Sequence, residues 1–158
     1  MISVKDGKMY QTILVPLDGS KRAEAILGHV EHLVKNNNAT VILLKVEEET
    51  ILLGHDEVID VDKYRKKYEE RIELSKAYLE TLKNSFSEKG INAVTQIAYG
   101  SVVRAILNAA SETNSNLIAL ATHGFGGLAK VSYGSVAAGL LQAAEIPILL
   151  IRSCSDKQ

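Results

Sequence analysis

The feature that most constrains the fold is an alternation, along the whole chain, of short apolar segments with longer segments in which apolar residues recur at helical spacing. The run Val41–Leu44 has no polar face, which is typical of a strand buried on both sides of a sheet. Strands that alternate with helices predict a parallel sheet with helices on both of its faces. We expect five strands, at Thr12–Leu17, Thr40–Val46, Asn92–Ala98, Asn116–Ala121 and Ile146–Ile151.

The segments between these strands predict four helices. Ser20 is a good N-terminal cap for the first, and three asparagines at 36–38 end it. The second is long and charged, has a 3-4 repeat that predicts a buried stripe from Tyr64 to Phe86, and ends at Gly90. We expect the helices at about residues 20–35, at Val61 to about Lys89, at Ser101–Ser111 and at Tyr133–Ala144. With right-handed crossovers, five parallel strands make a doubly wound α/β domain the natural topology.

The composition indicates a single domain and excludes two classes of partner. The 158 residues are 46% hydrophobic and 23% charged, which suits one compact domain. A formal net charge of -1 leaves no broad basic surface for nucleic acid or an anionic membrane. No apolar stretch approaches the roughly 20 residues that span a bilayer, and the first residues lack the apolar core of a signal peptide. We therefore expect a cytoplasmic protein whose partner is a small molecule or another protein, with no nucleic acid and no membrane.

The stretch from Ala121 to Val136 links the fourth expected strand to the last helix and is rich in glycine. It has three closely spaced glycines and then the pair Gly134-Ser135. Glycine has no Cβ, so backbone N–H groups here can approach an anion, and the start of the following helix favours the same negative charge. The layout indicates a phosphate site, although neither G-x-x-x-x-G-K-[ST] nor, at the first strand-to-helix turn, G-x-G-x-x-G is present. The alternative is that the glycines only close tight turns.

Two further segments, taken with the glycine spacing, resemble the universal stress protein family. They are the opening Ile13–Ser20 (I-L-V-P-L-D-G-S) and the second-strand run Val41–Val46. The resemblance covers nearly the whole chain and implies a single domain with its core at about residues 9–152. The ATP-binding branch of the family has the motif G-x2-G-x9-G-[ST]. Its first glycine is replaced here by Ala121, the smallest replacement, which lacks the conformational range of glycine. The residues that match the rest of the motif are Gly124, Gly134 and Ser135.

The resemblance implies the strand order 3-2-1-4-5, in which strands one and four are neighbours. Ligands bind open α/β sheets in the crevice at the carboxyl ends of two such strands, whose helices leave to opposite faces. The turn Leu17-Asp18-Gly19 and the glycine stretch both end in that crevice. We therefore expect ATP there, with Mg²⁺ carried by the phosphates. The expected site residues are Pro16, Leu17, Asp18, Val46, Leu120, Ala121, Gly124, Gly134, Ser135 and Val136.

The chemistry of nine of these residues suggests a role, Ala121 being the exception. The phosphates would be held by Gly124, Gly134, Ser135 and the backbone of Val136. An apolar slot for the base, at positions that match the family's adenosine site, would be lined by Pro16, Leu17, Val46 and Leu120. Asp18 would accept hydrogen bonds from the ribose hydroxyls or the adenine amino group, and its alternative role is an Asx-turn or a helix cap. Val46 and Leu120 are also core residues, with or without a ligand.

Other polar residues have simpler explanations than catalysis or metal binding. His123 lies beside the glycine stretch, but hydrolysis needs a positioned base and charge stabilisation, and no motif places an arginine finger or an acidic pair near it. We expect His123 to order the loop. His29 and His32 lie three apart in a helix without a third metal ligand, and Cys154 is expected to be an exposed free thiol. The connection at 47–60 is either a lid or partner surface, or an ordinary surface excursion.

The sequence and the resemblance together predict an ATP-binding regulatory protein of the stress response that acts through its nucleotide-bound dimer. The segment Ile146–Ile151 is apolar at every position and, in the inferred order, is an edge strand. Pairing with the same strand of a second chain would cover its unpaired backbone groups under two-fold symmetry, and the resemblance also implies a homodimer. Two alternatives stay open. One is slow ATP hydrolysis or autophosphorylation, and the other is an adaptor that binds no nucleotide, in which Ala121 marks a lost site.

Overall fold

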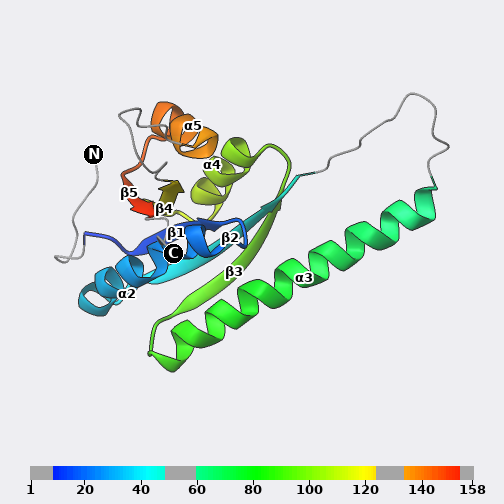
Figure 1. The fold of residues 1–158 in the computed structure, drawn as a ribbon. Helices are drawn as coiled ribbons and strands as arrows, with labels where there is room; N and C mark the ends of the chain where they lie inside the picture. The colour runs from blue at the N-terminus through cyan, green and yellow to red at the C-terminus, as the bar shows by residue number, and fades with distance from the viewer. Residues whose placement is uncertain (1–8, 49–59, 124–133, 154–158) are drawn as a thin grey trace, which may run out of the picture.

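The computed structural model of the protein describes residues 9–48, 60–123 and 134–153, and within them a five-stranded parallel sheet lies between two layers of helices (Figure 1). The strand order is β3-β2-β1-β4-β5, and every neighbouring pair is parallel. The predicted single α/β domain and its order 3-2-1-4-5 are therefore confirmed. The strands are β1 (Thr12–Leu17), β2 (Thr40–Glu47), β3 (Ala93–Tyr99), β4 (Leu117–His123) and β5 (Ile148–Ser153).

The helices divide between the two faces of the sheet (Figure 1). One face is covered by α1 (Lys21–Glu24), α2 (Ile26–Asn37) and α3 (Val61–Glu88), and the other by α4 (Val102–Glu112) and α5 (Ser135–Ala143). The first expected helix is thus two helices. Ala25 separates them, because its N–H bonds to the carbonyl of Arg22 at 3.3 Å, three residues back, which tightens the chain for one turn.

Four strands extend past their predicted ends, β2 and β3 by one residue and β4 and β5 by two. β4 continues past Ala121 to His123, and β5 begins two residues later than predicted and continues to Ser153. The register between them is unbroken, with Thr122 opposite Arg152 and His123 opposite Ser153. A polar residue at the end of an apolar run does not end the strand here, because the ladder with the neighbouring strand continues.

Each face of the sheet has its own hydrophobic core, as expected for central strands that are apolar on both sides. The core under α2 and α3 includes the fully buried Ile26, Leu79 and Phe86, and the core under α4 and α5 includes Ile106 and Leu140. The two helices of the second layer lie very close together at Gly139. A Cβ added there would lie 2.7 Å from a methyl group of Val103, so only glycine allows this approach, which fixes the position of α5.

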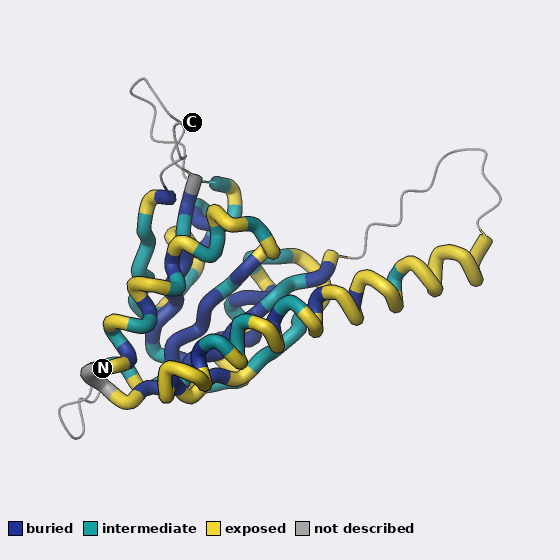
Figure 2. Tube along the Cα trace, turned by 60° about the horizontal axis from the view of Figure 1, so that its bottom comes forward, coloured by how far each residue is buried: buried dark blue, intermediate teal, exposed yellow. Residues whose placement is uncertain are grey.

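The long helix α3 packs on the sheet through its C-terminal part and extends past the sheet at its N-terminal end (Figures 1 and 2). The predicted buried stripe is confirmed from Ile72 to Phe86 and is wrong at Tyr64, which is 40% exposed. Val61, at the start of the helix, is 69% exposed. The reason is length. A helix of 28 residues is about 42 Å long, whereas a strand of seven residues spans only about 23 Å.

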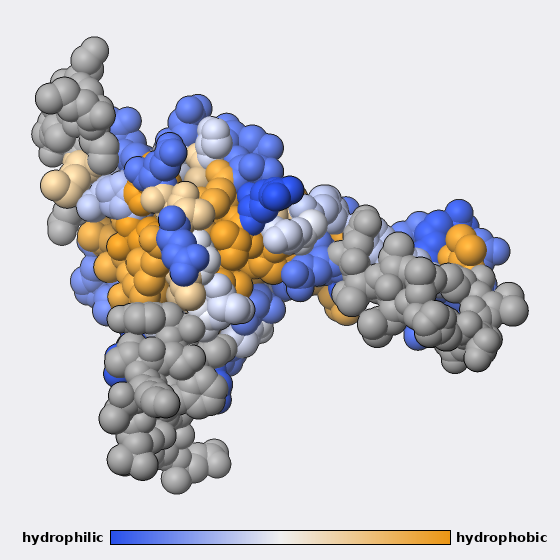
Figure 3. Space-filling view, turned by 90° about the horizontal axis from the view of Figure 1, so that it is seen from above, coloured by the Kyte–Doolittle hydropathy of each residue, from blue (hydrophilic) through white to orange (hydrophobic). Residues whose placement is uncertain are grey.

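The surface of this extension is charged. The visible part of α3 that projects from the body is largely hydrophilic, whereas apolar side chains gather over the body itself (Figure 3). Among the described residues, the structure has no helix of the length and hydropathy needed to cross a lipid bilayer.

Candidate functional site

The strands β1 and β4 separate at their carboxyl ends, and this opens the sheet where ligands are expected. They pair at only two positions, Ile13 with Leu117 and Leu14 with Ile118, although both strands continue beyond them. In a doubly wound sheet the two neighbours whose helices leave to opposite faces form the ligand crevice, and β1 and β4 are that pair.

The same two strands are held together at their amino ends by Asn116. Its side-chain oxygen accepts hydrogen bonds from the N–H groups of Gln11 and Thr12, both at 3.1 Å, and its own N–H donates to the carbonyl of Thr12. The pair is therefore closed at one end and open at the other. Nothing local in the sequence indicates that Asn116 bonds to residues more than 100 positions before it.

A pocket of about 490 Å³ lies at the open end. Nine of the ten predicted site residues line it, and Gly124 lies outside the described residues, as do Gly126 and Gly127. The nine are Pro16, Leu17, Asp18, Val46, Leu120, Ala121, Gly134, Ser135 and Val136. The structure thus brings together segments from β1, β2, β4 and α5. Seven further lining residues are not among those predicted, namely Ala23, Lys45, Glu48, Val102, Ile106, Thr122 and Ala137.

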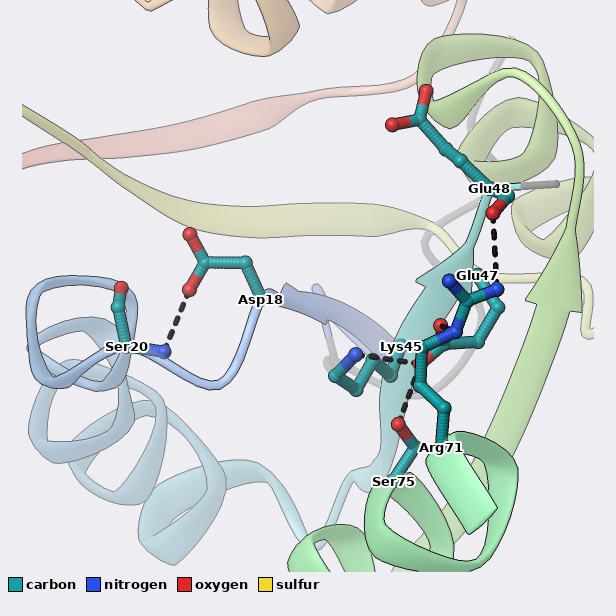
Figure 4. A network of polar contacts seen from close by, with 7 residues as sticks. All are labelled: Asp18, Ser20, Lys45, Glu47, Glu48, Arg71 and Ser75. Atoms are coloured by element: carbon teal, nitrogen blue, oxygen red, sulfur yellow. Dashed lines mark hydrogen bonds and ion pairs between the residues drawn. The ribbon is translucent and has the colours of Figure 1, made fainter. Parts of the chain in front are cut away.

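The turn after β1 holds Asp18 at the edge of this pocket. Its carboxylate accepts a hydrogen bond from the N–H of Ser20 at 2.8 Å, which makes an Asx-turn (Figure 4). The hydroxyl of Ser20 caps α1 by accepting from the N–H of Ala23 at 3.2 Å. Gly19, between Asp18 and Ser20, has φ +90°, which favours glycine. Both structural roles foreseen for this turn are therefore present, with Asp18 making the Asx-turn and Ser20 the cap.

A buried charged cluster lies behind the pocket, centred on Glu47, which is only 4% exposed (Figure 4). Its carboxylate pairs with the ammonium of Lys45 at 2.6 Å and the guanidinium of Arg71 at 3.0 Å, and it accepts a hydrogen bond from the hydroxyl of Ser75. Burial alone raises the pKa of Glu47. The hydrogen bonds from Lys45 and Ser75 and the charges of Lys45 and Arg71 outweigh burial, so that the pKa lies below its ordinary 4.5.

This cluster connects the pocket to the long helix. Lys45 lines the pocket, and Arg71 and Ser75 belong to α3. Arg71 also donates to the backbone carbonyl of Glu48 at 3.1 Å, so α3 holds the end of β2 through three contacts, two from Arg71 and one from Ser75. A signal for the cluster exists in the sequence, because Lys45 and Glu47 alternate with apolar residues and so share one face of the strand.

The start of α5 forms the opposite wall. The N–H of Gly134 donates to the hydroxyl of Thr122 at 3.2 Å, and the helix has no side-chain cap. Ser135, Val136 and Ala137, the first three helical residues, all line the pocket. The first N–H groups of a helix have no partners within it, and they favour an anion.

The remaining candidates either do not line this pocket or lie outside the described residues. His29 and His32 are exposed on α2, and the Nδ1 atom of His32 lies 2.8 Å from the carbonyl oxygen of Gly28 on the same helix. Cys154 and most of the 47–60 connection lie outside the described residues. In the described part of the chain, no three side chains of the metal-binding types come together.

Comparison with known sequences identifies relatives along nearly the whole chain. The model of the universal stress protein family matches residues 9–152. The universal stress protein YxiE of Bacillus subtilis (strain 168) is 30% identical over 151 residues, which cover 91% of this chain and 100% of that protein.

Comparison with solved structures agrees. Hypothetical protein MJ0577 has a TM-score of 0.76 at 25% identity, over 94% of this chain and 99% of that one. A universal stress protein family protein from Arabidopsis thaliana, solved with AMP bound, has a TM-score of 0.66 over 92% of this chain and 94% of that one. At 18% identity this second likeness shows the fold alone.

Proposed function

The chain belongs to the universal stress protein family, and from that premise we propose that the pocket between β1 and β4 binds an adenine nucleotide, ATP with Mg²⁺ on its phosphates. The protein would then act in the stress response through its nucleotide-bound state. A bound AMP in the plant relative supports the class of ligand. The pocket, at about 490 Å³, is in the range of small-molecule sites.

The observation that carries this proposal is the environment of Gly134. Its φ is -52°, an ordinary value for any residue, so the backbone does not require glycine there. A Cβ added at this position would have no described atom within 4 Å, so packing against the described residues does not require glycine either. Gly134 lines the pocket at the start of a helix. Glycine leaves room for a ligand to approach the backbone. This accounts for a glycine at position 134, which the backbone angles there do not require.

The charges around the pocket orient the nucleotide within it. Asp18 and Glu48 supply carboxylates at the end formed by β1 and β2, and the ammonium of Lys45 there is paired with Glu47. This end therefore disfavours phosphates. The start of α5, with Ser135 and Val136, favours them. We therefore place the phosphates at α5, the ribose near Asp18, and the base against the apolar side chains. When bound, Mg²⁺ would neutralise phosphate charge, and its ligands would be phosphate oxygens and water.

The test is to denature the purified protein and to identify by chromatography any nucleotide that it releases, followed by calorimetric titration of emptied protein with ATP and Mg²⁺. We expect an adenine nucleotide in the released fraction and saturable binding. Protein that releases none and does not bind ATP would favour the adaptor alternative. Steady ATP turnover well above that of a Ser135→Ala variant would instead favour an enzyme.

The departure from the family motif at Ala121 should matter little. Ala121 is half-buried, lines the pocket, and packs against one of the two cores. An Ala121→Gly variant should change ATP affinity less than tenfold, about 1.4 kcal/mol, because it removes a single methyl group beside a site made largely by backbone. Calorimetric titration of both proteins measures the difference. A much larger gain in affinity would mean that the natural protein has lost most of its nucleotide site.

We also propose that the chain forms a homodimer through β5. This strand is at one edge of the sheet, and Ile148, Leu149, Leu150 and Ile151 are each only half-buried in the single chain. An apolar edge with unpaired N–H and C=O groups is prone to pair with another strand. Pairing with the same strand of a second copy would satisfy these groups and would be self-complementary under two-fold symmetry.

The double substitution Leu149→Lys and Ile151→Lys should therefore yield monomers or insoluble protein. The natural chain should have a mass near twice 17.2 kDa by light scattering at micromolar concentration. The matched control is Leu74→Lys on α3, which packs at the opposite edge and exposes 72% of this residue. The control should stay dimeric. A natural chain with the mass of one copy would overturn the dimer.

A further inference from the structure

Thr122 is a buried polar residue that lines the pocket, and its hydroxyl oxygen and its carbonyl oxygen each accept a hydrogen bond. Its hydroxyl accepts from the N–H of Gly134 at 3.2 Å, and its carbonyl accepts from the hydroxyl of Ser153 at 2.7 Å. Thr122 and Ser153 are both buried. The end of β4 is thereby linked to the start of α5 on one side and to the end of β5 on the other.

The hydroxyl of Thr122 is not needed for the strand itself. A β-branched side chain suits a strand, and valine would serve equally there. A buried hydroxyl, however, has a desolvation cost that only a hydrogen bond offsets. The partner that offsets it is the N–H of Gly134, twelve residues later, at the N-terminal cap position of α5. The bond therefore joins the end of one strand to the position at which the phosphates are proposed to bind.

We propose that Thr122 is the positioning residue of the phosphate site, which holds the Gly134-Ser135 start of α5 against the end of β4. This inference rests on the proposed function. With the N–H of Gly134 held by Thr122, the next N–H groups of the helix start stay in the pocket lining, where they would meet the phosphates. Ser153 in turn holds the backbone of Thr122 in place. Thr122 acts through α5 and serves the phosphate end only.

The test is a pair of substitutions measured with two ligands. Thr122→Val keeps the shape and the β-branch but removes the hydroxyl, and Thr122→Ser keeps the hydroxyl. We expect Thr122→Val to bind ATP about tenfold more weakly, the effect of one lost hydrogen bond. Its affinity for adenosine, which has no phosphate, should stay within about twofold of the natural value, and Thr122→Ser should restore ATP binding. A merely structural role would weaken both ligands together.

Three outcomes decide against the proposal. Unchanged ATP affinity in Thr122→Val, or an equal loss for ATP and adenosine, overturns the positioning role while nucleotide binding itself stands. A natural protein that binds neither ligand overturns the proposed function and this inference with it. Should Thr122→Val not fold, as thermal melting would show, Ser153→Ala supplies the second test. It should weaken ATP about threefold and leave adenosine unchanged, and equal effects on the two ligands would overturn the role.

Discussion

Replacing Gly134 with valine should abolish nucleotide binding and leave the fold intact. The backbone there has φ -52° and ψ 157°, which valine adopts without strain, and a Cβ would have no described atom within 4 Å. The new side chain would instead occupy pocket volume at the start of α5 and keep phosphates away from the backbone. We expect at least a hundredfold loss of ATP affinity, about 2.7 kcal/mol.

Calorimetric titration measures the loss, and thermal melting shows whether the variant is folded. Gly28→Val is the matched control, because Gly28 is exposed on α2 and a Cβ there also has no described atom within 4 Å. This control should bind ATP as the natural protein does. If Gly134→Val is folded and binds ATP with unchanged affinity, the glycine serves only the turn, and the phosphates do not lie at α5.

Replacing Glu47 with glutamine should lower the free energy of unfolding by about 2–3 kcal/mol, or roughly 5–10 °C in melting temperature. The carboxylate is buried and pairs with Lys45 and Arg71. Removing its charge leaves the largely buried ammonium of Lys45 without compensation, which costs more than the pair itself contributes. Denaturant unfolding at pH 7 measures the difference.

The loss of unfolding free energy in Glu47→Gln should become smaller as the pH falls. The pKa of Glu47 lies below its ordinary 4.5 in the folded chain, so the unfolded chain takes up the proton first as the pH falls. The stability that Glu47 contributes is fully present above pH 4.5 and is lost as the pH falls through the lower, folded-state value. The gap between the natural protein and Glu47→Gln should therefore close below pH 4.5.

Glu73→Gln is the control, because Glu73 pairs with Lys76 on the same helix with 70% of its side chain exposed. Exposed pairs contribute less than about 1 kcal/mol, so this variant should unfold almost as the natural protein does. Equal stability of the two glutamine variants would mean that the cluster around Glu47 does not stabilise the fold.

The parts of the fold that were predictable from the sequence are those in which local pattern and burial agree. The apolar run Val41–Leu44 is a central strand, and the residues that stop or cap helices, such as Ser20, are where the pattern places them. The strand order was not predictable from local pattern. Periodicity alone predicts a parallel sheet, and it was the resemblance that implied the order 3-2-1-4-5, because pairing between distant strands leaves no local signal.

The errors also have physical causes. Thr122 and Glu47 are polar residues at the ends of apolar runs, where polarity suggests solvent, yet both are buried and bonded to another element, Thr122 to the start of α5 and Glu47 to α3. Tyr64 continues the apolar repeat of α3 but lies past the sheet that would bury it. Helical spacing shows which residues share a face, whereas the length of the opposing strands decides how much of that face is covered.

The short pairing between β1 and β4 has a thermodynamic consequence. Within the sheet, β3-β2-β1 and β4-β5 form two blocks whose strands pair at two positions, with Asn116 bonded to Gln11 and Thr12 beside them. A ligand that touches Pro16 on one block and Ser135 beside the other joins them across the open end. Its binding free energy is added to the stability of the folded chain according to its concentration. The free energy of unfolding would then report how much nucleotide surrounds the protein.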